Sequence, residues 1–389
     1  MSRRLLFVVN IPRFFVSHRL PLAQAAREAG YDVHVATADG DEEHLATIVQ
    51  HGFVLHRLPL EQHGTRPVME LRTLLALLRL MRRVRPDLVH LVTIKPVLYG
   101  GIAARLTRRR AVVAAMSGLG RAFRDSTGAV QRPNRLLVAA MRFALPPVRS
   151  HVLTQNADDL TVLRALRVAH PEASSVIPGS GVDLHVFRPT PRTNPSGPAT
   201  FLYAGRLMRQ KGLEDFVEVA RRLHGRARFV VAGYSEDGSP DAIPVRQVER
   251  WADKGIIEWL GSRSDMPVVL ADSDVVVLPS VYGEGVPKTL IEAAACGRAI
   301  VTTDMPGCRD ICRDGINGLL VEPANVDALE GAVGALIADP AARQRMGVEG
   351  RRIAEAGFGL ATIRQQTLQL YDTLLSGVGA RTSTGHADG

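Results

Sequence analysis

The chain has 389 residues, of which 46% are hydrophobic and 22% charged, a composition typical of a folded protein with two domains and unlike that of a disordered one. Its net charge of +9 is uneven: residues 1–190 carry 26 Lys and Arg against 14 Asp and Glu, whereas residues 191–389 carry 22 against 25. We expect no membrane-spanning helix, because no apolar run reaches roughly 18 residues, and no secretory signal. The three cysteines (Cys296, Cys308 and Cys312) favour a reducing cytoplasm.

Apolar runs and helical periods alternate along the first half of the chain. We expect strands at 5–10, 32–37, 53–58, 87–92 and 111–116, and helices at 17–29, 68–84 and 97–106. Continuous apolar strands separated by helices predict a parallel sheet with helices on both faces.

The alternation starts again after a segment rich in Pro, Thr, Ser and Gly at 190–200, which we interpret as a linker. Strands are expected at 200–204, 227–232, 256–260, 275–278 and 299–302, and helices at 212–223, 287–296, 328–338 and 340–346. The predicted fold is α/β, with two tandem Rossmann-like, doubly wound domains that face each other across a cleft. Ligands of such sheets bind at the carboxyl ends of the strands.

The expected boundaries follow from these elements. The first domain is placed at 1–185 and the second at 186–360. A last helix at 361–375 is expected to cross back to the first domain. The Gly- and Ser-rich tail at 376–389 is expected to be disordered.

A loop with two cations follows the strand expected at 200–204. It reads Gly205-Arg206-Leu207-Met208-Arg209-Gln210-Lys211-Gly212 and leads into a helix. Gly205 permits close approach of the backbone to a ligand, and Arg206 and Lys211 can bind a diphosphate beside the amides of the helix start. Lys is rare in this Arg-rich chain, occurring only at 95, 211, 254 and 288. A surface loop with solvated cations is the alternative interpretation.

An acidic turn between glycines follows the strand expected at 275–278. It reads Gly283-Glu284-Gly285-Val286-Pro287-Lys288-Thr289-Leu290-Ile291-Glu292, and Pro287 suits the first turn of a helix. Glu292 lies about two turns beyond Glu284, in a helix that is largely apolar. A carboxylate there needs a partner, and the hydroxyls of a ribose would serve. A helix cap for Glu284 and a structural ion pair for Glu292 are the alternatives.

Together, the two segments resemble the retaining GT-B-fold glycosyltransferases of family four. The G-R-L-x-x-x-K-G pattern matches residues 205–212, and the E-x7-E motif in its E-G-x-P form matches residues 284–292. The runs at 181–183, 303–307 and 314–318 also fit, so the resemblance covers most of residues 176–325 in the expected order.

The resemblance implies roles for these residues. Arg206 and Lys211 would hold the donor diphosphate and stabilise the charge that develops on it, while Glu284 would contact the donor sugar near its reacting face. These three are the expected catalytic residues. Further donor-binding residues would be Gly205, Gly285, Val286, Pro287, Lys288 and Glu292. No metal or other cofactor is expected, and the Asp272-Ser273-Asp274 run is interpreted as a turn.

The first half of the chain resembles, less specifically, enzymes that build bacterial surface polysaccharides and lipid-linked oligosaccharides. The matching runs are Ser17-His18-Arg19-Leu20-Pro21-Leu22, Thr93-Ile94-Lys95-Pro96 and Ser117-Gly118-Leu119-Gly120. His18, Lys95, Ser117 and Gly118 are therefore candidate acceptor-binding residues, and Lys95 could meet a pyrophosphate. A structural role for His18 and a surface cation at Lys95 stay open.

Two departures from the family pattern limit this transfer of roles. Many relatives carry a double-glycine turn after the first strand, where this chain has Asn10-Ile11-Pro12. Many also carry a His where this chain has Ser117, so a catalytic role of that His does not transfer.

The expected function is retaining, metal-independent transfer of a sugar from a nucleotide-sugar, by family habit a UDP-sugar, to a polyprenyl-diphosphate-linked or polysaccharide acceptor. The basic first half, with Phe14-Phe15 and the Arg79–Arg85 stretch, suggests docking on the anionic inner face of the plasma membrane. No nucleic-acid partner is expected. A UDP-sugar 2-epimerase and a non-catalytic sugar-nucleotide-binding protein are the alternatives; a dehydrogenase is disfavoured, because G-x-G-x-x-G is missing after the first strands.

Overall fold

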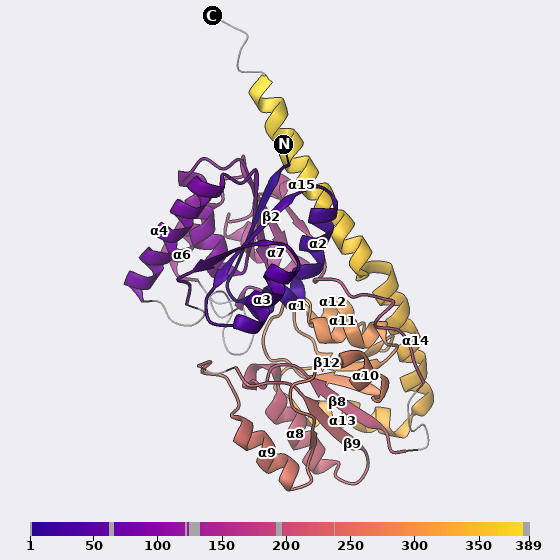
Figure 1. Ribbon diagram of the computed structural model, residues 1–389. Helices are drawn as coiled ribbons and strands as arrows, with labels where there is room; N and C mark the ends of the chain where they lie inside the picture. The colour runs from indigo at the N-terminus through magenta and orange to yellow at the C-terminus, as the bar shows by residue number, and fades with distance from the viewer. Residues whose placement is uncertain are drawn as a thin grey trace, which may run out of the picture. The chain divides into compact units, whose positions relative to one another are not determined.

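A computed structural model describes residues 2–61, 66–120, 123, 133–191, 197–236 and 238–383, with side chains to residue 377. The chain forms two compact units (Figure 1). The first unit comprises Met1–Leu119, Arg132–Ser180 and Thr362–Gly389, and the second comprises Gly120–Gln131 and Gly181–Ala361. Part of the expected linker, residues 192–196, lies outside the described residues.

The first unit is built on a parallel sheet in the order β3-β2-β1-β4-β5-β6-β7. The central strands β4 and β5 are buried along their whole length, as their mostly apolar sequences predict. The strands are β1 (Arg4–Val9), β2 (Asp32–Ala38), β3 (Val54–Leu58), β4 (Leu88–Val92), β5 (Ala111–Met116), β6 (Ser150–Thr154) and β7 (Ser174–Val176).

Helices cover both faces of this sheet. They are α1 (Pro12–His18), α2 (Leu20–Glu28), α3 (Glu42–Gln50), α4 (Pro67–Val84), the π-helical turn η1 (Pro96–Gly100), α5 (Gly101–Leu106), α6 (Arg135–Ala144), α7 (Ala157–Ala165), the 3-10 turn η3 (Pro171–Ala173) and α15 (Leu360–Ser383). The long last helix belongs to this unit through Ile363 and Tyr371, which are buried in its core.

Three helix expectations were wrong in detail. The helix expected at 17–29 begins at Pro12 and is interrupted at Arg19, because Pro21 lacks an N–H and its ring would clash with the carbonyl of residue 17. The helix expected at 97–106 begins as the π-helical turn η1. The last helix, expected at 361–375, runs from Leu360 to Ser383, since extending an anchored helix is much easier than nucleating one. Residues 384–389 of the tail that was expected to be disordered lie outside the described residues.

The second unit has a parallel sheet in the order β10-β9-β8-β11-β12-β13. The strand expected at 256–260 is shorter than predicted. The strands are β8 (Thr200–Ala204), β9 (Arg228–Ala232), β10 (Glu258–Trp259), β11 (Val275–Leu278), β12 (Ala299–Thr303) and β13 (Gly318–Val321). The helices are the 3-10 turn η4 (Arg209–Lys211), α8 (Leu213–Arg222), α9 (Val245–Asp253), α10 (Met266–Ala271), α11 (Lys288–Ala295), α12 (Cys308–Ile311), α13 (Val326–Ala338) and α14 (Pro340–Gly357).

Strand order places the candidate sites. In the second unit the order reverses at β8, between β9 and β11, and in the first it reverses at β1, between β2 and β4. Ligands of doubly wound sheets bind outside the carboxyl ends of strands at such a reversal. Among the described helices, none combines the length and the apolar character needed to cross a bilayer.

Candidate functional site

The loop after β8 carries the first cation of the candidate donor site. Arg206 Nη1 lies 2.6 Å from Glu236 Oε2, a carboxylate in the loop after the neighbouring strand β9. The hydroxyl of Tyr203 donates to the carbonyl oxygen of Arg206 at 2.8 Å and so ties the loop to strand β8. Burial, and then the charge of Glu284, raise the pKa of Tyr203 well above its usual range, so this hydroxyl stays protonated.

Lys211 and Glu284 form the centre of the site. Lys211 Nζ lies 2.7 Å from Glu284 Oε1, and the two side chains are only 12% and 13% exposed. Ser280, two residues beyond β11, donates from its hydroxyl to the same carboxylate oxygen at 3.4 Å. The expected catalytic residues therefore come together from two loops. One follows β8, where the strand order reverses, and the other follows its neighbour β11.

Two glycines allow these loops to approach each other. Gly212 has φ +72°, and a Cβ atom there would lie 2.1 Å from the carbonyl oxygen of Pro279. Gly307, in the loop after β12, has φ +84°, and a Cβ atom there would lie 1.9 Å from the carbonyl oxygen of Gly285. Only glycine combines this backbone conformation with such close contacts, so both positions fix the shape of the site.

Glu292 and Lys288 form a second pair on α11. Glu292 is 6% exposed, and its Oε1 lies 2.9 Å from Lys288 Nζ, one turn earlier. Among the described residues, this pair shares no hydrogen bond or ion pair with Lys211. The structural ion pair that sequence reasoning held as an alternative for Glu292 is thus present, although its outer partner is 32% exposed.

The electrostatics of the site keep its cations charged. Burial lowers the pKa of Arg206, but the carboxylates of Glu236 and Glu284 more than offset it and raise the pKa above its usual value. The pKa of the Cys308 thiol rises to about 12, through burial and then the charge of Glu284, so this cysteine is not a nucleophile. The arrangement offers two partly buried cations to an anion, with carboxylates that hold them in place.

The other expected donor-binding residues lie around the same turn. Gly205 directly follows β8, and its amide donates a hydrogen bond to the carbonyl oxygen of Ala232 on the neighbouring strand β9 at 3.0 Å. Val286 is 6% exposed, and Pro287 is the residue before the first turn of α11.

The candidate acceptor residues lie at the carboxyl edge of the first unit's sheet. His18 ends α1, stacks on Phe14 with ring centroids 4.2 Å apart, and has its Nδ1 2.6 Å from the hydroxyl of Ser17. Ser117 and Gly118 follow β5, and Gly118 has φ +98°. These contacts give His18 a packing role and leave its part in acceptor binding a prediction.

The ammonium of Lys95 already has hydrogen-bond partners within the first unit. Its ammonium donates to Glu70 Oε1 at 2.7 Å and to the carbonyl oxygen of Glu61 at 3.0 Å. Burial, and then the charge of Glu70, raise the pKa of the adjacent Tyr99 to about 12. The surface-cation alternative for Lys95 is wrong, since the side chain is 21% exposed and paired with α4.

Sequence reasoning missed three residues here. Glu236 pairs with Arg206, Glu70 pairs with Lys95, and Arg19 donates to the hydroxyl of Ser117 at 3.3 Å. Glu236 follows β9, so the rule that ligands gather after strand ends could have identified it. Arg19 lies inside the Ser17–Leu22 run, but nothing in that run signals its burial.

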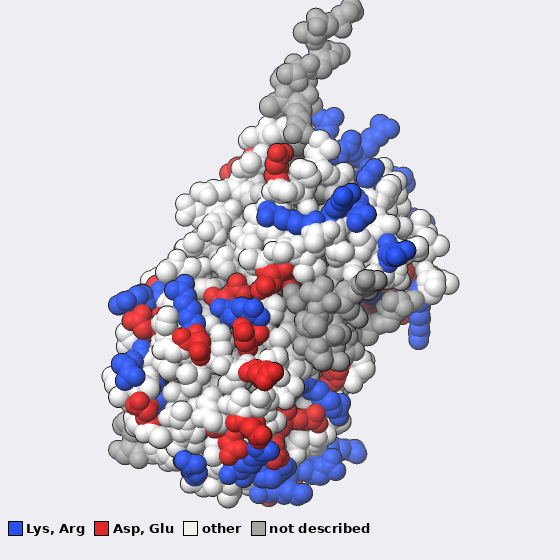
Figure 2. All heavy atoms as spheres, turned by 180° about the vertical axis from the view of Figure 1, so that it is seen from behind, with Lys and Arg blue, Asp and Glu red and all other residues white. Residues whose placement is uncertain are grey.

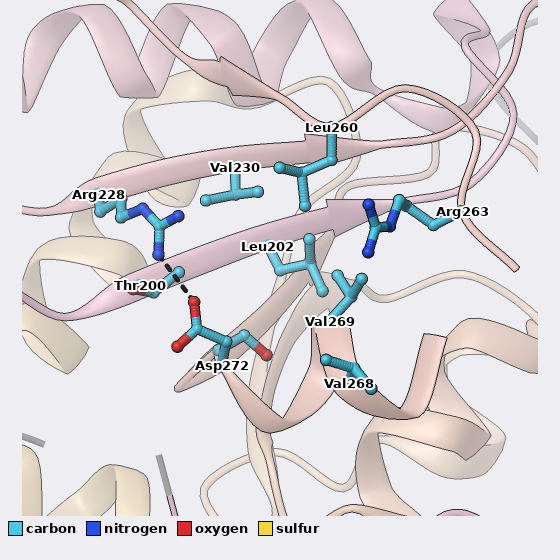
Figure 3. A pocket seen from close by; sticks show the side chains of 10 residues that line it. Thr200, Leu202, Arg228, Val230, Leu260, Arg263, Val268, Val269 and Asp272 are labelled. Carbon is cyan, nitrogen blue, oxygen red and sulfur yellow. Dashed lines mark hydrogen bonds and ion pairs between the residues drawn. The ribbon is translucent and has the colours of Figure 1, made fainter. Parts of the chain in front are cut away.

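A separate pocket of about 300 Å³ lies in the second unit, against one face of its sheet (Figure 3). Leu202, Val230 and Leu260 line it from the strands and their ends, and α10 contributes Val268 and Val269. Asp272, part of the run interpreted as a turn, caps α10 and pairs with Arg228 at 3.0 Å. The candidate donor residues do not line this pocket.

Comparison with known proteins identifies the family. Residues 198–339 match the family model described as glycosyl transferases group 1, and residues 4–149 match the model described as glycosyl transferase 4-like. The two matches together span about three quarters of the chain and place one model on each half. The chain therefore belongs to the GT-B-fold glycosyltransferases and is a glycosyltransferase enzyme.

Individual relatives agree with this assignment. The chain is 23% identical over 371 residues to the N,N'-diacetylbacillosaminyl-diphospho-undecaprenol alpha-1,3-N-acetylgalactosaminyltransferase of Campylobacter jejuni, covering 92% of this chain and 96% of that protein. It is 28% identical over 281 residues to the UDP-Gal:alpha-D-GlcNAc-diphosphoundecaprenol alpha-1,3-galactosyltransferase of Escherichia coli, covering 68% and 70%.

A solved structure shares the fold. HepE of Anabaena, in complex with UDP and glucose, superposes with a TM-score of 0.76 at 20% identity over 96% of this chain and all of that one. The expected α/β architecture with two parallel-sheet domains is thereby confirmed.

Proposed function

We propose that this enzyme transfers a sugar from a UDP-sugar to a polyprenyl-diphosphate-linked acceptor in bacterial surface-glycan biosynthesis, with retention at the anomeric carbon. The observation that carries the proposal is the partly buried cluster of Arg206, Lys211 and Glu284 at the reversal of strand order. Two relatives whose names specify diphospho-undecaprenol acceptors support the acceptor class. The Anabaena structure with UDP supports the donor class.

The chemistry follows from where charge develops. The bond between the anomeric carbon and the donor diphosphate breaks, the acceptor hydroxyl oxygen bonds to that carbon, and its proton passes to a phosphate oxygen on the same face. Arg206 and Lys211 stabilise the departing diphosphate. These two cations take the role that a divalent metal plays in other transferases, so we expect activity without added metal.

The carboxylate partners of these cations are compatible with donor binding. A guanidinium has five N–H donors and an ammonium three, so each cation can keep its carboxylate and still donate to a phosphate. Arg206 uses one donor on Glu236, and Lys211 uses one on Glu284. The carboxylates thereby orient the cations before the donor arrives, which lowers the ordering cost of binding.

The test is a donor panel. The protein is incubated with UDP-, GDP- and dTDP-sugars and polyprenyl-diphosphate-sugar acceptors, and products are read by mass spectrometry with and without a metal chelator. One lipid product, heavier by a single sugar and formed with a UDP-sugar in the presence of chelator, supports the proposal. An isomerised free donor with no lipid product would show an epimerase instead.

Exposed apolar and basic side chains on helices α4, α5 and α6 of the first unit form a docking surface, which supports binding of the enzyme to the inner face of the plasma membrane. Exposed apolar side chains on α4 recur at helical spacing: Val68 is 65%, Leu71 56% and Leu75 40% exposed. Helix α5, which contacts both α4 and α6, adds Leu106, and α6 adds Leu136 and Phe143. Apolar side chains among cations favour an anionic membrane surface.

The cations of this surface include Arg72, Arg79 and Arg83 on α4 and Arg135 and Arg142 on α6. Figure 2 shows basic side chains with few acidic ones among them over this unit, and mixed signs over the other. The docking role expected for Phe14-Phe15 is wrong for Phe15, which is fully buried against Phe7 and Phe53.

Sedimentation with liposomes tests the docking surface. We expect binding to vesicles with anionic lipid, weakened by high salt because exposed charges are screened within about 10 Å at 0.1 M salt. Replacing Leu71 and Leu136 with Ser should weaken binding, whereas replacing Val348, exposed on α14 of the other unit, should not. Equal binding to neutral vesicles would contradict the proposal.

A further inference from the structure

Arg19 is a buried cation that has no negatively charged partner among the described residues. The residue is 7% exposed and lies between α1 and α2, at the carboxyl edge of the first unit's sheet. Nη1 donates to the carbonyl oxygen of His18 at 3.1 Å, and Nη2 donates to the hydroxyl of Ser117 at 3.3 Å. Both acceptors are uncharged, and a neutral donor could serve them equally well.

The surroundings of Arg19 hold no compensating charge within the described part of the chain. No carboxylate there pairs with it, and its charge interacts with the buried side chains of His90 and Tyr371. Burial lowers the pKa of Arg19 to about 10, so the side chain remains protonated at neutral pH. A buried charge without a partner is strongly unfavourable, which makes its presence here informative.

Other unsatisfied polar atoms gather at the same edge. Buried without a hydrogen-bond partner are Nε of Arg19, Oδ1 of Asn10 after β1, and Oγ1 of Thr93 after β4. Thr93 also has φ +73°, which is strained for a β-branched residue. Strands β1, β4 and β5 are neighbours in the sheet. The loops that carry Asn10, Thr93 and Ser117 therefore begin next to one another at the carboxyl edge of that sheet.

The chemistry of these atoms defines a ligand. Arg19 offers the Nε–H to an anion, and the hydroxyl of Ser117, which accepts from Arg19, keeps its own proton to donate. Thr93 Oγ1 can donate to an anion as well, while Asn10 Oδ1 can only accept and suits a sugar hydroxyl. A phosphate group attached to a sugar satisfies all of these atoms.

We propose that Arg19, Ser117 and Thr93 form an anion-binding subsite for the diphosphate of the acceptor, with Asn10 beside it for the first sugar. The proposal rests on the proposed function, because it assigns the diphosphate to a polyprenyl acceptor. It moves the diphosphate contact from Lys95, which Glu70 already neutralises, to Arg19.

Binding of inorganic pyrophosphate and of geranyl diphosphate, measured by calorimetry with saturating UDP to occupy the second unit, tests the subsite. Arg19→Gln should weaken both by at least about tenfold, because a charge-assisted hydrogen bond is lost. Arg19→Lys should recover part of the loss. Arg27→Gln removes an exposed cation of α2 and should change neither.

Enzyme kinetics separate this subsite from a purely structural role. Arg19→Gln should raise KM for the lipid acceptor and leave KM for the donor unchanged. If Arg19→Gln does not fold, Ser117→Ala removes one hydroxyl and should weaken both ligands about threefold or more.

Wild-type affinity of a folded Arg19→Gln for both ligands would overturn the inference. A loss for pyrophosphate alone would overturn the acceptor assignment, since geranyl diphosphate would then bind elsewhere. If wild-type protein transfers no sugar to any lipid acceptor, the proposed function fails, while the pyrophosphate comparison still tests the anion site.

Discussion

The carboxyl edges of the two sheets treat their buried cations in opposite ways. In the second unit, Arg206 and Lys211 each have a carboxylate within 2.7 Å. In the first unit, Lys95 is paired in the same manner, but Arg19 contacts only uncharged acceptors in the described residues. The cations Arg206 and Lys211 at the edge of the second unit thus have carboxylate partners without a ligand, whereas Arg19 at the edge of the first unit has none among the described residues.

This difference teaches what each edge requires of its ligand. The paired cations of the second unit are held in position at all times, which suits a site whose ligand leaves as a charged group during reaction. Among the described residues, the guanidinium of Arg19 in the first unit has no carboxylate partner, so binding of an anionic ligand there should stabilise the fold by mass action.

The largest effect should come from Lys211→Ala. Removing the ammonium deprives the leaving diphosphate of a buried charge, and loss of one such group typically lowers turnover by about 100- to 1,000-fold. Steady-state kinetics with the UDP-sugar that the donor panel identifies would measure this loss of turnover. Lys254→Ala, which removes an exposed lysine from the same unit, should have wild-type kinetics.

A second variant separates the loss of charge from damage to the site. Lys211→Ala leaves the buried Glu284 without its partner, which itself destabilises the loop. The double variant with Glu284→Gln removes that carboxylate charge. It should regain thermal stability over Lys211→Ala but stay inactive. Recovery of activity in the double variant would refute the role of Lys211.

The site was predictable where it is local in sequence. Lys211 and Glu284 each lie in a short run that combines glycine, charge and a following helix, so each could be singled out alone. Their carboxylate and ammonium meet across 73 positions of sequence, and Glu236 lies 30 positions from Arg206. Such pairings depend on which strands become neighbours, and strand periodicity does not encode strand order.

The fold was predictable where burial is continuous. Strands β4 and β11 are buried along their whole length and were found with nearly correct ends. The interruption at Arg19 was missed because the helical pattern continues through it, and only the ring of Pro21 stops the hydrogen bonds. The contact that anchors α15 could not be predicted, because Tyr371 forms its hydrogen bond with His90, 281 positions away.

Gly212→Ala should strongly destabilise the paired edge. A methyl group there meets the carbonyl oxygen of Pro279 at 2.1 Å in a left-handed backbone conformation, which should lower the free energy of unfolding by about 2–3 kcal/mol. Gly255→Ala has a similar φ of +67° with open space around the added carbon, so it should cost only about 1 kcal/mol. Chemical denaturation of both variants measures the difference, and equal losses would show that close approach is unimportant.

Glu292→Gln should have a smaller effect, confined to the donor. If Glu292 binds the ribose hydroxyls, removing its charge should raise KM for the donor about tenfold and change kcat little, because charged hydrogen bonds contribute about 1.5–3 kcal/mol. Glu249→Gln, at an exposed position of α9, is the matched control. An unchanged donor KM would leave Glu292 with only its structural pair to Lys288.

The smallest effect should be acid sensitivity in the first unit, away from both edges. His56 Nε2 lies 2.9 Å from His34 Nδ1, and His56 Nδ1 lies 3.3 Å from an Arg83 nitrogen. Burial, followed by the charges of His34 and Arg83, lowers the pKa of His56 from 6.5 to about 4. Protonation therefore favours the unfolded chain, so stability is complete above pH 6.5 and declines as pH falls toward 4.

Because His56 is only half-buried, solvent screening should limit the loss to about 1 kcal/mol between those two pH values. Denaturation at a series of pH values measures it, with His56→Gln expected to flatten the profile and His185→Gln, an exposed histidine of the other unit, expected to leave it unchanged. An identical slope in His56→Gln would assign the acid sensitivity to other groups.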